Sequence, residues 1–180
     1  GESGFGGGGG GGGGPLGGGG GGEMNQNPDI HFQQRETINP YYEKLPGIVQ
    51  KYMTEINRLR GTNYDLVTYY GAEDAEEVIV TMGSVAQTIE QTVDYLQEQG
   101  RKVGFLNVHL YRPFPVETFL EKIPQSVKAI AVLDRTKEPG AGGEPLLLDV
   151  QSAMYEADIR PTIIGGRYGL GSKDVLPNQI

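Results

Sequence analysis

From residue 78 onward, short runs of β-branched and aromatic residues alternate with longer amphipathic segments, and this alternation limits the possible folds more than any other feature. The strands predicted in this way are 78–82, 103–110, 127–133 and 161–164, and the helices between them are 86–99, 116–122 and 146–157. Strands that alternate with helices pair in parallel, because each helix returns the chain across the sheet in a right-handed crossover. The sequence therefore predicts an α/β fold with a mainly parallel sheet.

Residues 1–22 are nearly all glycine and are not expected to fold. Glycine loses the most backbone entropy on folding and has no side chain to bury. The tract is interpreted as a linker, a tag or glycines that stand in for unresolved residues, with a natural flexible tail as the alternative. The chain is accordingly divided into the glycine tract (1–22), an N-terminal extension with one helix (23–71) and an α/β domain (72–180).

The N-terminal extension carries weaker signals. Two apolar residues alternate with polar ones within 30–33, which favours a short extended piece. Asn39 and the proline after it then favour a helix start, although Pro46 allows a later one, and Gly61 is a natural stop. The broad apolar stripe of this helix indicates that it packs on something. A short edge element is predicted over 63–71.

Composition excludes some classes of function. The formal net charge of −8 argues against nucleic acid as a partner. The sequence has no cysteine, so it predicts no disulfide and no cysteine-ligated zinc or iron–sulfur cluster. Its two histidines, His31 and His109, lack neighbouring carboxylates and do not favour a metal site. No segment resembles a targeting peptide or a membrane span, so a cytoplasmic location is expected.

A charged loop follows the predicted strand 127–133 and holds Asp134, Arg135, Lys137 and Glu138. Ligands and partners of open α/β sheets gather at the carboxyl ends of strands, where this loop is expected to lie. No pair of nucleophile and general base is visible in it. The loop is therefore interpreted as an interlocked salt-bridge loop at an interface, and no catalytic, cofactor-binding or metal-binding residue is assigned.

Other candidates lie at the remaining strand ends. Ser84 is expected either to cap the following helix or to help hold an anion there. Arg112 is expected either to bind a carboxylate or phosphate or to form an ion pair with Asp134 or Glu138. Arg167 and Lys173 belong to a glycine-rich loop that suits contact with an anion and docking of another domain equally well.

Several blocks of the sequence, in the right order, resemble pyruvate:ferredoxin (flavodoxin) oxidoreductase. They cover most of the chain after the glycine tract. The blocks are NPDIHFQQRE at 27–36, NPYY at 39–42, YGAEDAE at 70–76, MGS at 82–84, LYRPF at 110–114, VLDRTKEPG at 132–140 and GGRYGLGSKD at 165–174.

This resemblance implies a fold and an activity. The fold would be a three-layer α/β/α domain similar to the transketolase C-terminal domain. The complete enzyme would be several times longer and would oxidatively decarboxylate pyruvate with coenzyme A to acetyl-CoA and CO2. Thiamine diphosphate, Mg and iron–sulfur clusters would lie in other parts of it, and electrons would pass to ferredoxin or flavodoxin.

Within such an enzyme, the resemblance implies that this segment binds no cofactor and is inactive alone. Its partners would be other domains of the same polypeptide and the second subunit of a homodimer. Two alternatives remain. One is a stand-alone anion- or nucleotide-binding module that uses residues 83–84, Arg112 and 165–173. The other is a part of a different 2-oxoacid:ferredoxin oxidoreductase.

Overall fold

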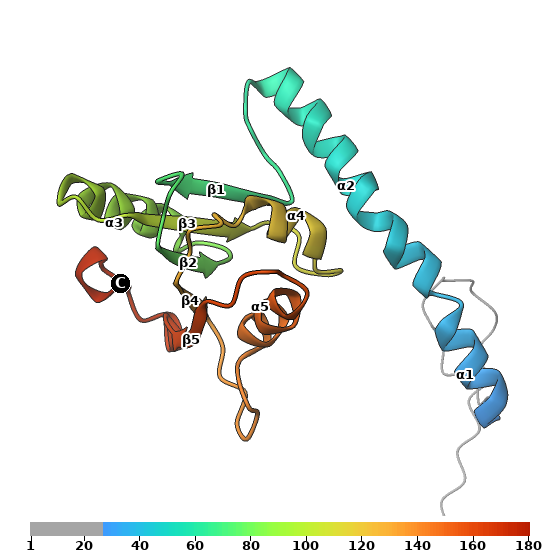
Figure 1. Ribbon diagram of the computed structural model, residues 1–180. Helices are drawn as coiled ribbons and strands as arrows, with labels where there is room; N and C mark the ends of the chain where they lie inside the picture. The colour runs from blue at the N-terminus through green and yellow to red at the C-terminus, as the bar shows by residue number, and fades with distance from the viewer. Residues whose placement is uncertain (1–26) are drawn as a thin grey trace, which may run out of the picture. The chain divides into compact units, whose positions relative to one another are not determined.

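The computed structural model describes residues 27–180 (Figure 1). The chain divides into two compact units, residues 1–37 and 38–180, each of which is described by itself. The glycine tract at 1–22 lies outside the described residues. The expected division between an extension and an α/β domain after residue 71 stays a prediction.

The first unit contains the helix α1 (Pro28–Glu36), so the extended piece predicted around 30–33 is wrong. The helix begins here because Asn27 caps it: the Asn27 side chain accepts a hydrogen bond from the Ile30 N–H at 3.0 Å. Pro28 at the first helical position needs no such partner. This capping signal favours a helix more strongly than an alternation of only two apolar residues favours an extended piece.

The second unit begins with the long helix α2 (Asn39–Arg60). It starts one residue earlier than expected, with Ile38 at the capping position, and continues through Pro46. Gly61 ends it in the left-handed conformation, as predicted. No residue of α2 is buried, and most of the large apolar side chains in its stripe are exposed.

A five-stranded sheet forms the centre of the second unit. Its strands are β1 (Val67–Gly71), β2 (Glu77–Thr81), β3 (Val103–Val108), β4 (Ala129–Asp134) and β5 (Thr162–Arg167). Their order across the sheet is β1-β3-β2-β4-β5. The edge strand β1 pairs antiparallel with β3, and all other neighbours are parallel. The mainly parallel sheet and the edge element within 63–71 are thus confirmed.

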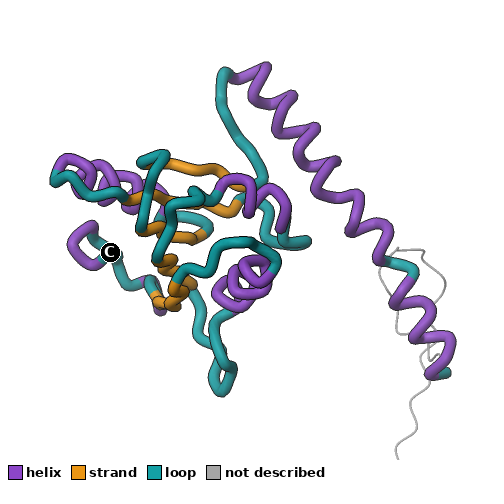
Figure 2. The backbone as a smooth tube through the Cα atoms, viewed as in Figure 1, coloured by secondary structure: helices purple, strands orange, loops and turns teal. Residues whose placement is uncertain are grey.

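Helices cover both faces of the sheet, which confirms the three-layer architecture (Figure 2). The helix α3 (Ala86–Glu98) packs on one face, in an apolar cluster with β-strand residues such as Phe105. The helices α4 (Val116–Lys122) and α5 (Pro145–Tyr155) pack on the other face, around Phe119 and Ile130. This second cluster is the larger of the two.

The chain after β5 returns to the face covered by α3. It contains two short 3-10 helices, η1 (Leu170–Ser172) and η2 (Pro177–Gln179), and η2 contacts α3. Val175 and Ile180 join the apolar cluster under α3. None of the helices within residues 27–180 combines the length and the apolar character that a membrane crossing requires.

Candidate functional site at the carboxyl edge of the sheet

The carboxyl ends of β2 and β4 flank a topological switch point. After β2 the chain enters α3 on one face, and after the neighbouring strand β4 it enters α5 on the opposite face. Ligands of α/β sheets bind in the crevice at such a point. The eight candidate residues from the sequence lie at this edge in three groups. Asp134, Lys137, Glu138 and Arg167 surround the start of α5, Arg112 lies beside α5, and Ser84, Arg135 and Lys173 line a cavity near α3.

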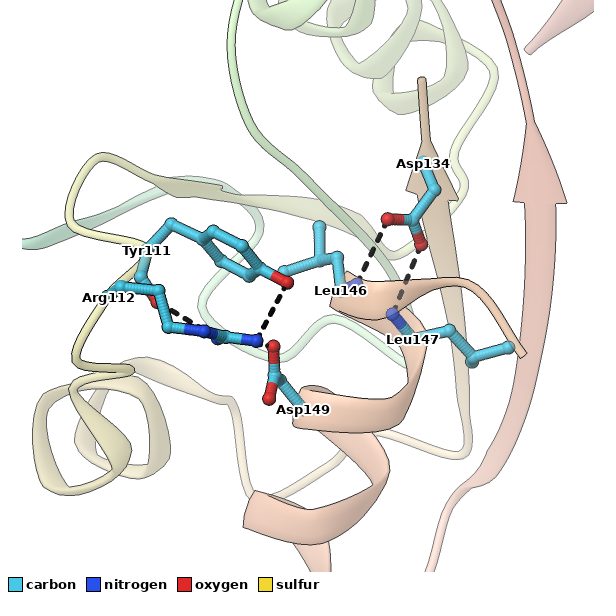
Figure 3. Close-up of polar contacts among 6 residues, drawn as sticks. All are labelled: Tyr111, Arg112, Asp134, Leu146, Leu147 and Asp149. Atoms are coloured by element: carbon cyan, nitrogen blue, oxygen red, sulfur yellow. Dashed lines mark hydrogen bonds and ion pairs between the residues drawn. The ribbon is translucent and has the colours of Figure 1, made fainter. Parts of the chain in front are cut away.

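Asp134 holds the start of α5 (Figure 3). It is 1% exposed, and its carboxylate accepts the backbone N–H groups of Leu146 at 3.0 Å and Leu147 at 3.1 Å. Burial raises the pKa of the Asp134 carboxyl, and the two backbone hydrogen bonds act in the opposite direction. Because the first N–H groups of a helix have no partners within it, Asp134 serves as a structural cap.

The buried carboxylate of Glu144 is the centre of the ion pairs in the charged loop. It pairs with Arg167 Nε, lies 3.8 Å from Lys137 Nζ, and accepts the backbone N–H of Glu138 at 2.7 Å. Burial acts to raise its pKa, but Arg167, the Glu138 N–H and Lys137 together hold the pKa of the Glu144 carboxyl below its usual value.

The sequence reasoning missed Glu144, although an acid directly before a helix-starting proline is a recognisable N-terminal signal. It also placed Arg167 in a loop, whereas the strand β5 extends to that residue. Within the charged loop, Lys137 and the backbone N–H of Glu138 meet at the Glu144 carboxylate, whereas Arg135 makes hydrogen bonds only to neutral groups. The expected role of this loop at an interface stays a prediction.

Arg112 forms an ion pair, but not with the partners named from the sequence. Its Nη1 lies 2.6 Å from Asp149 Oδ2 in α5, so the predicted pairing with Asp134 or Glu138 is wrong. The guanidinium carbon lies 4.0 Å from the ring centroid of Tyr111, and Nη2 lies 3.0 Å from the Tyr111 hydroxyl (Figure 3). Burial, with a contribution from Asp149, raises the pKa of Tyr111 to about 12. The Arg112 guanidinium therefore joins the loop after β3 to α5.

Ser84 does not cap α3, because Val85 occupies the capping position and no side chain caps the helix there. The Ser84 hydroxyl instead accepts a hydrogen bond from Arg135 Nη1 at 3.3 Å, and Arg135 Nε donates to the Gly169 carbonyl at 3.2 Å. Arg135 thus connects the ends of β2 and β5. The expectation that Ser84 is a helix cap is wrong, and its expected role in anion binding stays a prediction.

The residues present do not fit a metal centre. Residues 27–180 hold no group of three or more histidine, cysteine, aspartate or glutamate side chains placed to hold a metal ion. An iron–sulfur cluster needs cysteine ligands, and the sequence has none. His109 lies instead near Thr68 Oγ1, at 3.2 Å, and burial lowers its pKa.

Glu144→Gln is expected to lower the melting temperature of the chain at neutral pH but not in acid. The folded pKa of Glu144 lies below its ordinary value of 4.5, so its carboxylate stabilises the fold above that pH. The contribution is lost as the pH falls through the folded pKa. The difference in melting temperature between the variant and the wild type should therefore be largest near pH 7 and should shrink as the pH falls below 4.5. Glu138→Gln is the control, since only its backbone N–H takes part in the network; an equal change in both variants would contradict the role of Glu144.

Comparison with known proteins places this edge in a family. Residues 75–180 match the model of the pyruvate:ferredoxin oxidoreductase core domain II. The chain is 59% identical over 155 residues to the pyruvate-flavodoxin oxidoreductase of Enterobacter agglomerans. It is 56% identical over 155 residues to the pyruvate:ferredoxin oxidoreductase of Moorella thermoacetica. Each alignment covers 86% of this chain and 13% of the relative, so the chain spans about an eighth of their length.

One solved structure is similar to part of this chain. It is the 2-oxoglutarate:ferredoxin oxidoreductase of Magnetococcus marinus with 2-oxoglutarate, coenzyme A and succinyl-CoA bound, at 20% identity and a TM-score of 0.47. The similarity covers 68% of this chain and 19% of that one. The family model, by contrast, covers more than half of the chain, including every residue of the charged edge described above. The chain therefore belongs to the pyruvate:ferredoxin oxidoreductase core domain II family.

Proposed function

We propose that this chain is the domain II segment, with its preceding helices, of an enzyme that oxidatively decarboxylates pyruvate with coenzyme A to acetyl-CoA and CO2. Electrons would pass to ferredoxin or flavodoxin. The observation that carries the proposal is the identity of 56–59% over 86% of the chain to two pyruvate oxidoreductases. Because the chain spans 13% of each relative, the reaction belongs to the longer polypeptide.

Within that polypeptide we assign the segment a scaffolding and docking role. Two arginines at the carboxyl edge are paired inside the chain: Arg112 with Asp149, and Arg167 with Glu144. Such pairs fix the loops that a neighbouring domain would contact. Thiamine diphosphate, magnesium and iron–sulfur clusters would be held by other parts of a cytoplasmic homodimer, and they would supply the carbanion and electron-transfer chemistry.

The helix α2 provides the surface for docking. Large apolar side chains recur along one side of it at helical spacing, and these are exposed: Tyr41, Ile48, Tyr52, Ile56 and Leu59. A helix with such a stripe normally buries it against another element. The curated relatives are several times longer than this chain, so the occupant we propose is another part of the same polypeptide.

The activity is tested on the complete polypeptide. Purified enzyme should reduce flavodoxin or ferredoxin when supplied with pyruvate and coenzyme A, and should do so more slowly with 2-oxoglutarate. The 180-residue chain alone should give no reduction. Preference for 2-oxoglutarate would assign the chain to a different 2-oxoacid oxidoreductase and overturn the proposed substrate.

Tyr52→Asp in the complete polypeptide is expected to lower pyruvate oxidation by about tenfold or more, because truncating a buried aromatic at an interface costs about 2 kcal/mol or more. Tyr52 is 64% exposed in this chain, so the same change should leave the melting temperature of the 180-residue chain nearly unchanged. Thr54→Asp introduces the same charge on the opposite side of α2 and is the matched control. Equal activity of both variants would rule out α2 as a docking surface.

A further inference from the structure

A cavity of about 160 Å³ lies at the carboxyl edge of the sheet, on the side of α3. Its walls come from the start of α3 and from three loops: Ser84 follows β2, Arg135 follows β4, and several residues between 168 and 175 follow β5. A water molecule takes up about 30 Å³ in the liquid, so the cavity has room for about five heavy atoms, the size of a phosphate group. It also lies at the switch point between β2 and β4, where α/β sheets bind ligands.

The alternation of side chains along β4 explains why Arg135 reaches this cavity. Ile130, Val132 and Asp134 are buried, while the residues between them are only partly buried. Successive side chains of a strand point to opposite faces. Asp134 therefore lies on the side of α5, which it caps, and Arg135 lies on the side of α3. The two opposite charges are neighbours in sequence but do not neutralise each other.

Arg135 contacts only neutral acceptors. Its Nε donates to the Gly169 carbonyl at 3.2 Å and its Nη1 to the Ser84 hydroxyl at 3.3 Å. No carboxylate of residues 27–180 lies within ion-pair distance of it, in contrast to Arg112 and Arg167. A guanidinium has five N–H donors. The positive charge and the remaining donors of Arg135 are therefore available to a ligand.

Lys173 supplies a second positive charge to the same cavity. It is exposed, and its ammonium has no hydrogen bond or ion pair within the described part of the chain. The hydroxyls of Thr88 and Ser172 also line the cavity, and Asp174 adds one carboxylate. The lining therefore has one more positive than negative charge.

The loop after β5 has an unusual backbone conformation where it lines the cavity. Ser172 has a φ of +61°, which residues with a Cβ rarely adopt. Such conformations gather at functional sites, where the surrounding structure holds them in place. Gly169 also has a φ of +61°, and a Cβ there would lie 3.1 Å from Arg135 Nε. The glycine thus allows the Arg135 side chain to lie against the loop.

We propose that this cavity binds a phosphate group, free or as a monoester, through Arg135 and Lys173, with the hydroxyls of Ser84 and Ser172 as further hydrogen-bond partners. Phosphate monoesters carry about −1.5 to −2 charges at pH 7, which two cations can match. Arginine binds phosphate oxygens with paired N–H donors, and lysine adds a point charge. This site goes beyond the scaffolding role and does not depend on it.

The test is a calorimetric titration of the 180-residue chain with inorganic phosphate near neutral pH, at constant ionic strength. Saturable binding is expected, and Arg135→Ala should weaken it by about tenfold or more, since hydrogen bonds to charged groups are the strong ones. Lys173→Ala should also weaken it, and because the exposed Lys173 side chain has no hydrogen bond or ion pair within residues 27–180, misfolding is not expected to account for that loss. Lys137→Ala, a cation directed at Glu144, is the control and should bind phosphate as the wild type does.

Two further ligands identify the source of the phosphate. Tighter binding of glycerol phosphate than of inorganic phosphate would indicate a monoester, and the reverse would indicate free phosphate. Acetate should bind at least about tenfold more weakly than phosphate, because it carries a single charge. Failure of phosphate to saturate, equal affinity for acetate, or equal binding by the Arg135, Lys173 and Lys137 variants would overturn the proposal.

Discussion

Phe119→Ala is expected to lower the free energy of unfolding by about 3–5 kcal/mol, the largest loss that a single substitution in this chain should cause. Phe119 is fully buried between the sheet and α5, and its ring centroid lies 5.3 Å from that of Phe114. Alanine removes the apolar area and leaves a cavity that the neighbouring helices cannot fill completely. Urea unfolding should show a lower midpoint at an unchanged slope.

Two variants keep this result interpretable. Phe119→Leu fills part of the space and should cause a smaller loss, which remains measurable if the alanine variant does not fold. Tyr155→Ala removes an aromatic ring that is 84% exposed and should change the stability by less than about 0.5 kcal/mol. A Phe119→Ala loss as small as that of Tyr155→Ala would mean that the α4 side of the sheet is not a tightly packed core.

The architecture could be predicted from the sequence because the spacing of apolar residues and the length of each apolar run are local properties of the chain. Alternating strands and helices from residue 78 onward predicted β2 to β5 and α3 to α5 within a few residues. The error at α1 has a local cause too. Asn27 before Pro28 is a strong helix start, and it decides the conformation of this short polar segment.

The location of the candidate site could be predicted from the sequence, but the ion-pair partners of its charged side chains could not. The carboxyl edge follows from the strand order, and the alternation Ile130, Val132, Asp134 already places the Asp134 carboxylate on the face that α5 covers. The partner of Arg112 depends on where α5 lies relative to β3, and Asp149 is 37 residues away in sequence. Such a pair is set by tertiary packing, and no local pattern distinguishes Asp149 from nearer acids.

A close contact between β1 and β3 also could not be predicted from the sequence. Tyr69 lies on β1 two residues before Gly71, which pairs with Gly104 on β3. The Tyr69 ring lies over Gly104, and its hydroxyl donates to the Ala72 carbonyl. An aromatic ring packed over a strand glycine stabilises the pairing of the two strands. Other residues can adopt the backbone conformation of Gly104. Glycine is therefore required at this position because the Tyr69 ring leaves no room for a Cβ.

Gly104→Ala is expected to lower the free energy of unfolding by about 1–3 kcal/mol, although alanine normally suits a strand better than glycine. The added Cβ would lie 2.7 Å from Tyr69 Cζ, so the ring must move and its hydrogen bond to Ala72 must weaken. Gly142→Ala is the matched control, because no atom lies within 4 Å of the Cβ added there. Its effect should stay within about 0.5 kcal/mol.

The double variant Tyr69→Ala/Gly104→Ala distinguishes this clash from a general intolerance of β3 to substitution. Tyr69→Ala alone should destabilise the chain, because it removes a partly buried ring that packs on the core. Once the ring is absent, the three closest contacts of the alanine at position 104 are removed, so the double variant should lose less than the sum of the two single losses. The coupling free energy from urea unfolding of the four proteins measures that difference. Additive losses would mean that Gly104 is required by the β3 backbone itself, and that the packing of Tyr69 over it contributes nothing to the pairing of β1 with the parallel sheet.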